Sequence, residues 1–163
     1  EVSGIFKLLI KGVASKLQEL HENNVIVNII GDWSVIPEDS KKSVVKALET
    51  TKNNTGLKLN IALNYGGRAE IVRAVKSAIE SGFKPCDISE ESFSKLLYTA
   101  DMPDPDLIIR TGGEMRLSNF LTWQSAYSEL YVVPTYWPDF TPDDFEKAIE
   151  VFQNRDRRFG GVK

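Results

Sequence analysis

The hydrophobic positions of the chain follow two spacings, one typical of helices and one of buried strands. Apolar residues recur every three or four positions over residues 2–22, which predicts an amphipathic helix. Residues 25–30 form a short apolar run, which predicts a buried strand. Further strands are predicted at 57–63, 107–109 and 130–133, and further helices at 37–52, 69–81, 89–98, 117–127 and from 141 onward.

Residues that cap helices support several of these boundaries. Ser89 precedes Glu90 and Glu91, an arrangement that favours a helix start because a hydroxyl accepts from free amides and acids suit the positive helix end. The run Thr141-Pro142-Asp143-Asp144 combines a cap, a proline and acids in the favoured order. Both sites therefore predict the beginning of a helix.

Strands that alternate with helices predict an α/β fold. We expect a single domain over residues 1–163, with a mostly parallel central sheet flanked by helices. Crossovers between parallel strands are right-handed, and ligands bind at the carboxyl ends of such strands. The chain starts at Glu1 and enters a helical pattern at once, so we also expect that a preceding segment has been removed.

Composition narrows the class of protein. Hydrophobic residues make up 42% and charged residues 26% of the chain, which excludes a disordered tail, a collagen-like fibre and a disulfide scaffold. No apolar run approaches the ~20 residues that span a bilayer. The net charge of -3 argues against a nucleic-acid partner, because such proteins carry a basic surface.

The chain has one cysteine, Cys86, and one histidine, His21. It cannot close an internal disulfide, which fits a reducing compartment, and it cannot build a Cys/His zinc site. His21 stands at the end of a helical pattern, where a solvated imidazole is favoured over a catalytic base. Catalysis by this chain must therefore use carboxylates, arginines, amides or a hard metal ion.

Two loops that follow predicted strands combine glycines with arginines, at residues 64–68 and 110–118. Paired glycines allow a turn whose amides face an anion, and arginine matches phosphate oxygens. For the first loop a plain strand-to-helix turn is an equal alternative. In the second, Arg110 and Arg116 bracket the glycines and Ser118 adds a hydroxyl at a predicted helix start. An anion site is favoured there, with surface charge as the alternative.

Three other features bear on the chemistry, and two of them allow two interpretations. Glu129 begins a predicted strand, so it is a metal ligand or the partner of an arginine. Residues 137–140 (WPDF), taken alone, predict a loop anchored in the core. The tail at 155–161 is a basic helix end, or a group of arginines brought to an anion on a neighbouring subunit. Neither glycine loop matches a dinucleotide or P-loop fingerprint, so a nucleotide-binding module lacks support.

Several segments together resemble the cis-prenyltransferases, of which undecaprenyl diphosphate synthase is the bacterial type. The resemblance runs in order along essentially the whole chain. The segments that carry it are NNVIVNIIGD at 23–32, NTGLKLNIALNYGGRAEI at 54–71, RTGGEMRLSNFLTWQSAYSELY at 110–131, WPDF at 137–140 and RDRRFGG at 155–161.

The resemblance implies a function. Members of this family condense isopentenyl diphosphate with an allylic diphosphate such as farnesyl diphosphate, with Z geometry and Mg²⁺, as homodimers or heteromers. It implies that isopentenyl diphosphate is bound by Arg110, Arg116, Leu117 and Ser118. It also implies that Glu129 binds Mg²⁺ and that a tail with Arg158 and Gly160 reaches the partner's site.

The resemblance has one departure, at the amino end. Family members carry an Asp-Gly-Asn motif, with the essential aspartate, before the region that matches Glu1, and an Asn-Trp pair follows it. We therefore expect that the chain lacks its first strand or strands, that its catalytic residues lie upstream, and that it is inactive alone. Met115 stands where some members have histidine.

A non-catalytic partner subunit of a heteromeric enzyme is the alternative function. Such subunits lose the diphosphate-binding residues, whereas Arg110, Arg116, Ser118 and Glu129 are all present here, which favours a catalytic lineage. The growing product needs an apolar tunnel, for which Leu57, Leu59 and Ile61 are candidates. A cytoplasmic location is expected, with loose attachment to membranes through the product.

Overall fold

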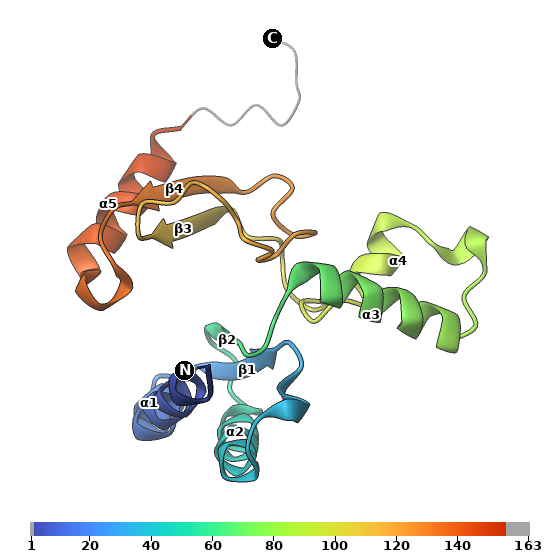
Figure 1. Cartoon of the computed structure of the whole chain (residues 1–163), viewed down its shortest axis with the longest axis horizontal. Coiled ribbons are helices and arrows are strands. Elements are labelled where there is room, and N and C mark those ends of the chain that lie inside the picture. Colours follow the sequence, from blue (N-terminus) through green and yellow to red (C-terminus); the bar gives the residue numbers. More distant parts are fainter. Residues whose placement is uncertain (1, 156–163) are drawn as a thin grey trace. The chain divides into compact units, whose positions relative to one another are not determined.

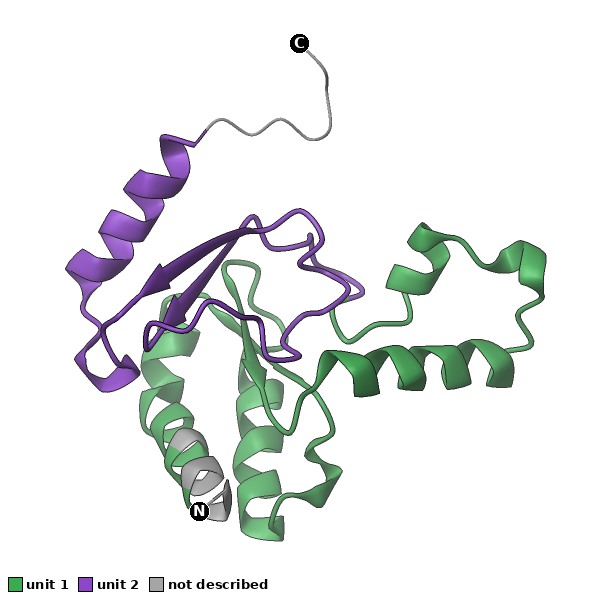
Figure 2. Cartoon of the chain, turned by 45° about the horizontal axis from the view of Figure 1, so that its top comes forward, with its two compact units in different colours: residues 1–99 green, residues 100–163 purple. Residues whose placement is uncertain are grey.

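The fold of the chain is described from a computed structural model, which describes the backbone of residues 2–155. The chain divides into two compact units, one over residues 1–99 and one over residues 100–163, which are coloured separately in Figure 2. The expectation of a single domain over residues 1–163 stays a prediction. Each unit combines helices with parallel strands, so the predicted α/β class is confirmed.

The first unit begins with a helix, α1 (Val2–Glu22), that leads into strand β1 (Ile26–Ile30). Helix α2 (Glu38–Thr51) crosses over to strand β2 (Lys58–Ala62), which lies parallel to β1 from Ile26↔Lys58 to Ile30↔Ala62. Figure 1 shows α1 and α2 beside this two-stranded sheet. Helix α3 (Gly67–Glu80) and the short helix α4 (Glu90–Ser94) complete the unit.

The core of the first unit lies between this sheet and the two helices. One buried cluster joins Ile10 of α1, Val44 of α2 and Leu63 after β2. A second cluster joins Leu17, Val27 and Ala47, and the half-buried Ile61 contacts both. Alternate residues of each strand therefore face the helices, as period-two burial requires.

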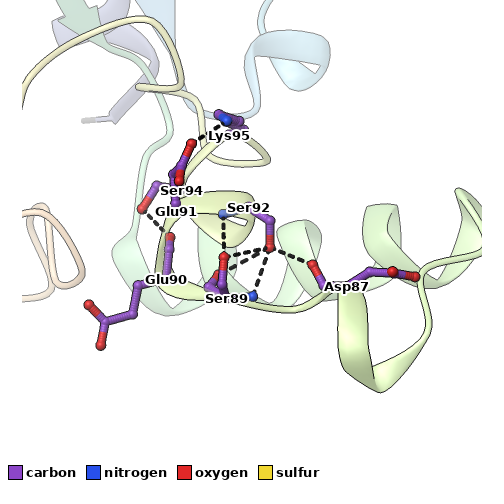
Figure 3. Close-up of polar contacts among 7 residues, drawn as sticks. All are labelled: Asp87, Ser89, Glu90, Glu91, Ser92, Ser94 and Lys95. Carbon is purple, nitrogen blue, oxygen red and sulfur yellow. Dashed lines mark hydrogen bonds and ion pairs between the residues drawn. The ribbon is translucent and has the colours of Figure 1, made fainter.

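Helix α4 begins where the sequence predicts, at a capping box. The Ser92 amide donates to Ser89 Oγ at 3.1 Å, and the Ser89 amide donates to Ser92 Oγ at 2.8 Å. Figure 3 shows this pair together with the Glu91–Lys95 ion pair. The helix ends at Ser94, four residues before the predicted end at 98, and turns follow it.

The second unit contains strand β3 (Leu107–Thr111), strand β4 (Glu129–Val133) and helix α5 (Pro142–Gln153). The two strands are parallel, in a register that runs from Leu107↔Glu129 to Thr111↔Val133. Helix α5 starts at the predicted cap: the Asp144 amide donates to Thr141 Oγ1 at 3.3 Å, and the Thr141 amide donates to the Asp144 carboxylate at 2.9 Å.

The predicted helix over residues 117–127 is wrong. That segment is a series of turns, and Ser118, Asn119 and Leu121 have positive φ angles of 49°, 65° and 47°. A right-handed helix cannot include such residues. Its apolar spacing therefore reflects side chains that alternate in exposure along an irregular connection between β3 and β4.

The predicted core anchor at residues 137–140 is also wrong within this chain. The side chain of Trp137 is 74% exposed and stacks on Phe140, with ring centroids 6.0 Å apart. Residues 137–139 form a single 3₁₀ turn. Within residues 2–155, no helix has the length and apolar character needed to cross a bilayer.

Candidate functional site: an arginine-lined loop at the carboxyl end of β3

Arg110 lies near the carboxyl end of β3, at the start of the second glycine loop. Its Nη1 donates a hydrogen bond to Ser118 Oγ at 3.1 Å and another to the backbone carbonyl of Arg116. The loop therefore folds back on the strand and brings the three predicted residues together. The Nε of Arg110 is buried and has no hydrogen-bond partner among the described residues.

The paired glycines turn this loop, but their amides do not face a ligand. Gly112 and Gly113 have positive φ angles of 87° and 77°, which favour glycine. The Gly112 amide donates to the Thr135 carbonyl at 2.9 Å, and the Gly113 amide donates to the Val133 carbonyl at 3.0 Å. The predicted amide cradle for an anion is therefore wrong, and anion binding here depends on the arginine side chains.

A cavity of about 260 Å³ lies beside these arginines within the second unit. Its polar wall is Arg110, Thr111 and Arg116, and its apolar wall includes Leu117 and Phe120. Arg116 is exposed and pairs with Glu114. Two guanidinium groups and an apolar wall together suit a phosphorylated hydrocarbon, because arginine matches phosphate oxygens and the wall accepts carbon.

Glu129 does not share this site. It pairs in register with Leu107, whereas Arg110 pairs with Val132, three residues further along β4. That separation is about 10 Å at ~3.3 Å per residue. Register partners share a face and successive residues alternate, so Glu129 and Arg110 also point to opposite faces of the sheet. One chain therefore does not bring both side chains to one ligand.

The partner of Glu129 in this chain is an arginine, one of the two roles its sequence position allowed. Arg155 Nη1 forms an ion pair with Glu129 Oε2. The side chains are 42% and 29% exposed, so the carboxylate remains reachable from solvent. Within residues 2–155, no three His, Cys, Asp or Glu side chains gather where they would hold a metal ion.

A single carboxylate nevertheless fits Mg²⁺ as a shared ligand. Mg²⁺ prefers oxygen and is usually held by one or two carboxylates together with water and substrate phosphates. Glu129 offers that kind of donor, half-buried and at the edge of the sheet. The donor set therefore fits a metal ion that arrives with a diphosphate.

The first glycine loop, at residues 64–68, is a strand-to-helix turn. Asn64 has a positive φ of 47° and its side-chain amide donates to the Asp32 carbonyl at 3.0 Å. Gly66 caps α3 and Gly67 begins it. Asp32 itself accepts hydrogen bonds from the Ser34 hydroxyl and amide, which lower the pKa of its carboxyl.

Sequence reasoning missed a buried carboxylate next to that loop. Glu70 is 1% exposed, and it accepts a 2.5 Å hydrogen bond from the Tyr65 hydroxyl and a 2.7 Å bond from the Tyr98 amide. Arg73 lies 4.0 Å from the centroid of the Tyr98 ring. Glu70, Arg73 and Tyr98 line a cavity of about 310 Å³ that Asp32 also borders.

One signal in the sequence points to the burial of Glu70. Buried Ala74 and Ala78 follow it at four-residue intervals, so the three residues share one face of α3. A small-residue face that begins with an acid indicates that the acid lies against another segment, with its hydrogen bonds satisfied there.

The tunnel candidates divide between surface and core. Leu57 is 71% exposed, whereas Ile61 lines an apolar cavity of about 10 Å³ between the β1–β2 sheet and helices α1 and α2. Val13, Val44 and Leu63 also line it. Arg158 and Gly160 of the predicted tail lie outside the described residues.

Fold and loop together define an α/β protein with an arginine-lined pocket at the carboxyl end of β3. A family model described as "Putative undecaprenyl diphosphate synthase" matches residues 1–160. The chain therefore belongs to the undecaprenyl diphosphate synthase family of prenyltransferase enzymes.

Curated relatives agree with that membership. The chain is 53% identical to an isoprenyl transferase of Clostridium perfringens over 167 residues, which cover 100% of the chain and 66% of that protein. It is 52% identical to an isoprenyl transferase of Heliobacterium mobile, covering 100% of the chain and 64% of that protein. The chain thus spans about two thirds of the length of these relatives.

Solved structures show the same fold. A probable undecaprenyl diphosphate synthase from Campylobacter jejuni superposes with a TM-score of 0.86 at 37% identity, over 99% of this chain and 75% of that one. Lavandulyl diphosphate synthase from Lavandula x intermedia, in complex with dimethylallyl diphosphate, gives a TM-score of 0.87 at 32% identity, over 98% of this chain and 70% of that one.

Proposed function

We propose that the complete protein is a cis-prenyltransferase that condenses isopentenyl diphosphate with an allylic diphosphate, such as farnesyl diphosphate, to make a Z-polyprenyl diphosphate. The observation that carries this proposal is the folded-back loop in which Arg110 contacts Ser118 and the Arg116 carbonyl beside an apolar wall. Membership of the prenyltransferase family and relatives named isoprenyl transferase support it.

The residues of this loop suit the binding of isopentenyl diphosphate. Arg110 and Arg116 neutralise phosphate charge, and Ser118 donates a hydroxyl from a position that the Arg110 contact fixes. Leu117 and Phe120 face the hydrocarbon end. Arginines that are already positioned stabilise charge on a diphosphate without first having to reorganise.

We propose that Glu129 supplies the carboxylate for Mg²⁺. Bound there, the ion would neutralise diphosphate charge and help an allylic diphosphate to leave. Arg155 pairs with one oxygen of that carboxylate in this chain, so its positive charge opposes a metal ion at Glu129. The readout for this role is a metal response that disappears in Glu129→Gln.

We propose a homodimer in which each diphosphate site draws on both subunits. The proposal is supported by the positions of Glu129 and Arg110, which lie at opposite ends and on opposite faces of the β3–β4 sheet. A second copy that presents its Glu129 to the first copy's Arg110 would complete one site and, by two-fold symmetry, the other. The tail residues Arg158 and Gly160 are proposed to act across the same interface.

The product tail needs an apolar enclosure. Burial of each added isoprene unit is favourable by about 3–4 kcal/mol, at ~0.8 kcal/mol per CH₂. We propose that the tail extends along the faces of α1 and α2 that meet Ile61 and Leu63, where a small apolar cavity already lies. We also propose a cytoplasmic protein that attaches loosely to membranes through this product.

We propose that residues 1–163 alone do not complete the reaction. An allylic diphosphate must be held and ionised, and the family resemblance assigns that task to an Asp-Gly-Asn segment before the region that matches Glu1. Relatives are about half as long again as this chain, which supports a missing subsite. Loss of a subsite removes an orientation effect that is worth up to ~7–11 kcal/mol.

A condensation assay with radiolabelled isopentenyl diphosphate and farnesyl diphosphate tests the proposal. We expect the complete protein to make a Z-polyprenyl diphosphate, Arg110→Ala to lose most of that activity, and residues 1–163 alone to make none. A complete protein without condensing activity would contradict the catalytic function and favour a non-catalytic partner subunit. Product from residues 1–163 alone would contradict only the proposed inactivity.

A further inference from the structure

Arg155 stands at the junction between α5 and the arginine-rich tail. It follows Asn154, the last cap residue of α5, and its amide donates to the Phe152 carbonyl at 3.2 Å. From there its guanidinium reaches across to the first residue of β4 and pairs with Glu129. The pair therefore joins the end of the last helix to the carboxylate that we assign to the metal ion.

The ion pair is not needed to end α5. The Asn154 amide donates to the Glu150 carbonyl at 3.2 Å, and the Asn154 side chain donates to the same carbonyl at 3.0 Å. These bonds already satisfy the end of the helix. Both members of the ion pair are also substantially exposed, so the pair adds little to the stability of the fold and opens readily.

A metal ion at Glu129 and Arg155 compete for one carboxylate. The Nη1 of Arg155 contacts Oε2, and among the described residues Glu129 belongs to no group of three or more His, Cys, Asp or Glu side chains that could hold a metal ion. A cation that binds this carboxylate meets the positive guanidinium at contact distance, where like charges repel. Metal binding at Glu129 therefore requires the Arg155 contact to weaken or break.

We infer that Arg155 is a positioning residue that sets the metal affinity of Glu129. It holds the carboxylate while no metal is present and yields it when metal binds together with a diphosphate. The released guanidinium is then available to phosphate oxygens, which it matches as well as it matches a carboxylate. This inference rests on the proposed role of Glu129, and it adds a competitor within the same chain.

The test uses Mn²⁺ alone as the probe, in the complete protein labelled with ¹⁵N. The readout is the Mn²⁺ concentration that half-broadens the backbone amide signal of Leu130, the residue after Glu129. We expect Arg155→Gln to lower that concentration about two- to fivefold, the range for losing an exposed ion pair. Glu129→Gln is expected to abolish the local broadening.

Lys147→Gln is the matched control. Lys147 is an exposed cation on α5, the helix that precedes Arg155, and it forms no ion pair with Glu129 in the described structure. It is expected to leave the midpoint unchanged. If Arg155→Gln needs as much Mn²⁺ as the unmodified protein, or more, Arg155 does not compete and the inference is overturned. Equal effects of Arg155→Gln and Lys147→Gln would also overturn it, because they would indicate overall charge.

The same titration separates this inference from the proposed metal role. If Glu129→Gln broadens as the unmodified protein does, Glu129 is not a metal ligand, and both the role and the inference fail. If Glu129→Gln loses the response while Arg155→Gln has no effect, the metal role stands and only the competition fails.

Discussion

At the scale of single residues, the loop after β3 shows how far residue types predict chemistry. The charges of Arg110 and Arg116 and the hydroxyl of Ser118 predict a phosphate site, and the structure brings these three residues together. The glycines predict an anion cradle made of their amides, yet those amides donate to the carbonyls of Val133 at the end of β4 and Thr135 just after it. The chemistry of a side chain can be predicted from its residue type, whereas the hydrogen-bond partner of a backbone amide depends on segments that are distant in the sequence.

Arg116→Ala tests the loop directly. We expect it to weaken isopentenyl diphosphate binding by ~1.5–3 kcal/mol, the range for a hydrogen bond to a charged group. Titration calorimetry on the complete protein measures this change. Lys147→Ala, which removes a surface cation from the same unit, is the control and is expected to bind normally. Unchanged affinity in both Arg110→Ala and Arg116→Ala would rule out a diphosphate at this loop.

The role of Glu70 as a buried hydrogen-bond acceptor was not predicted from the sequence. Its carboxylate connects the turn before α3 with the turns after α4, through the Tyr65 hydroxyl and the Tyr98 amide. Tyr65 lies five residues before Glu70, but Tyr98 lies 28 residues away, so the sequence shows no motif that joins all three. In the sequence, only the four-residue spacing of Glu70, Ala74 and Ala78 on one helix face indicates it.

Glu70→Ala is expected to destabilise the protein. Loss of the buried carboxylate leaves a half-buried amide and a half-buried hydroxyl without this acceptor, which costs about 1–3 kcal/mol. Urea unfolding followed by circular dichroism measures the change in the free energy of unfolding. Glu80→Ala, on the exposed end of α3, is expected to stay within about 0.5 kcal/mol. Equal stability of the two variants would show that the Glu70 contacts do not hold these turns together.

At the scale of elements, local signals predicted helices well where a cap and a period agree. Both α4 and α5 begin at the predicted capping residues, because the cap hydroxyl and the side chain three residues later, Ser92 in α4 and Asp144 in α5, each accept the other residue's amide. The segment at 117–127 has the period without a cap, and it is a set of turns. Positive φ at Ser118, Asn119 and Leu121 serves the loop around Arg110, and helical spacing alone did not reveal it.

The cap of α5 predicts a dependence of stability on pH. The backbone amide of Thr141 and then its hydroxyl bind the Asp144 carboxylate and hold its pKa below the ordinary value. A lowered folded-state pKa means that the stabilisation is complete above the unfolded pKa of about 3.9 and is lost as the pH falls through the folded pKa. The cap thus favours folding at neutral pH and not in acid.

Asp144→Asn tests that dependence. We expect the variant to melt at a lower temperature than the unmodified protein at about pH 7, and the difference to shrink as the pH falls through the lowered folded-state pKa of Asp144. Thermal melting at several pH values, with Asp143→Asn as a neighbouring control, measures it. A difference in melting temperature that stays constant across this range would contradict an ionised cap.

At the scale of the whole molecule, the sequence predicted parallel strands but not their pairing. In the described residues β1 pairs with β2 and β3 with β4, so the strands form two two-stranded sheets. Pairing depends on contacts between segments that are far apart, such as Leu107 with Glu129. The consequence for function is large, because this register separates two residues that the family resemblance assigns to one reaction.

That separation predicts complementation between two damaged subunits. Arg110→Ala and Glu129→Gln homodimers each lack one half of every site, so we expect little activity from either. In a mixed dimer whose sites form across subunits, Arg110 of the second variant meets Glu129 of the first, and one of the two sites is intact. Random reassortment after dissociation makes half of the dimers mixed, so the 1:1 mixture is expected to recover about a quarter of normal activity.

If both residues instead served the same subunit, every site in the mixed dimer would keep one lesion and mixing would restore nothing. A mixture of each variant with itself, dissociated and reassociated in the same way, controls for handling. Labelled condensation by the complete protein measures recovery, and light scattering verifies that dimers have formed again. Recovery to about a quarter would therefore locate Glu129 in the neighbour's site, and no recovery would contradict the shared site and place both residues in a site of one subunit.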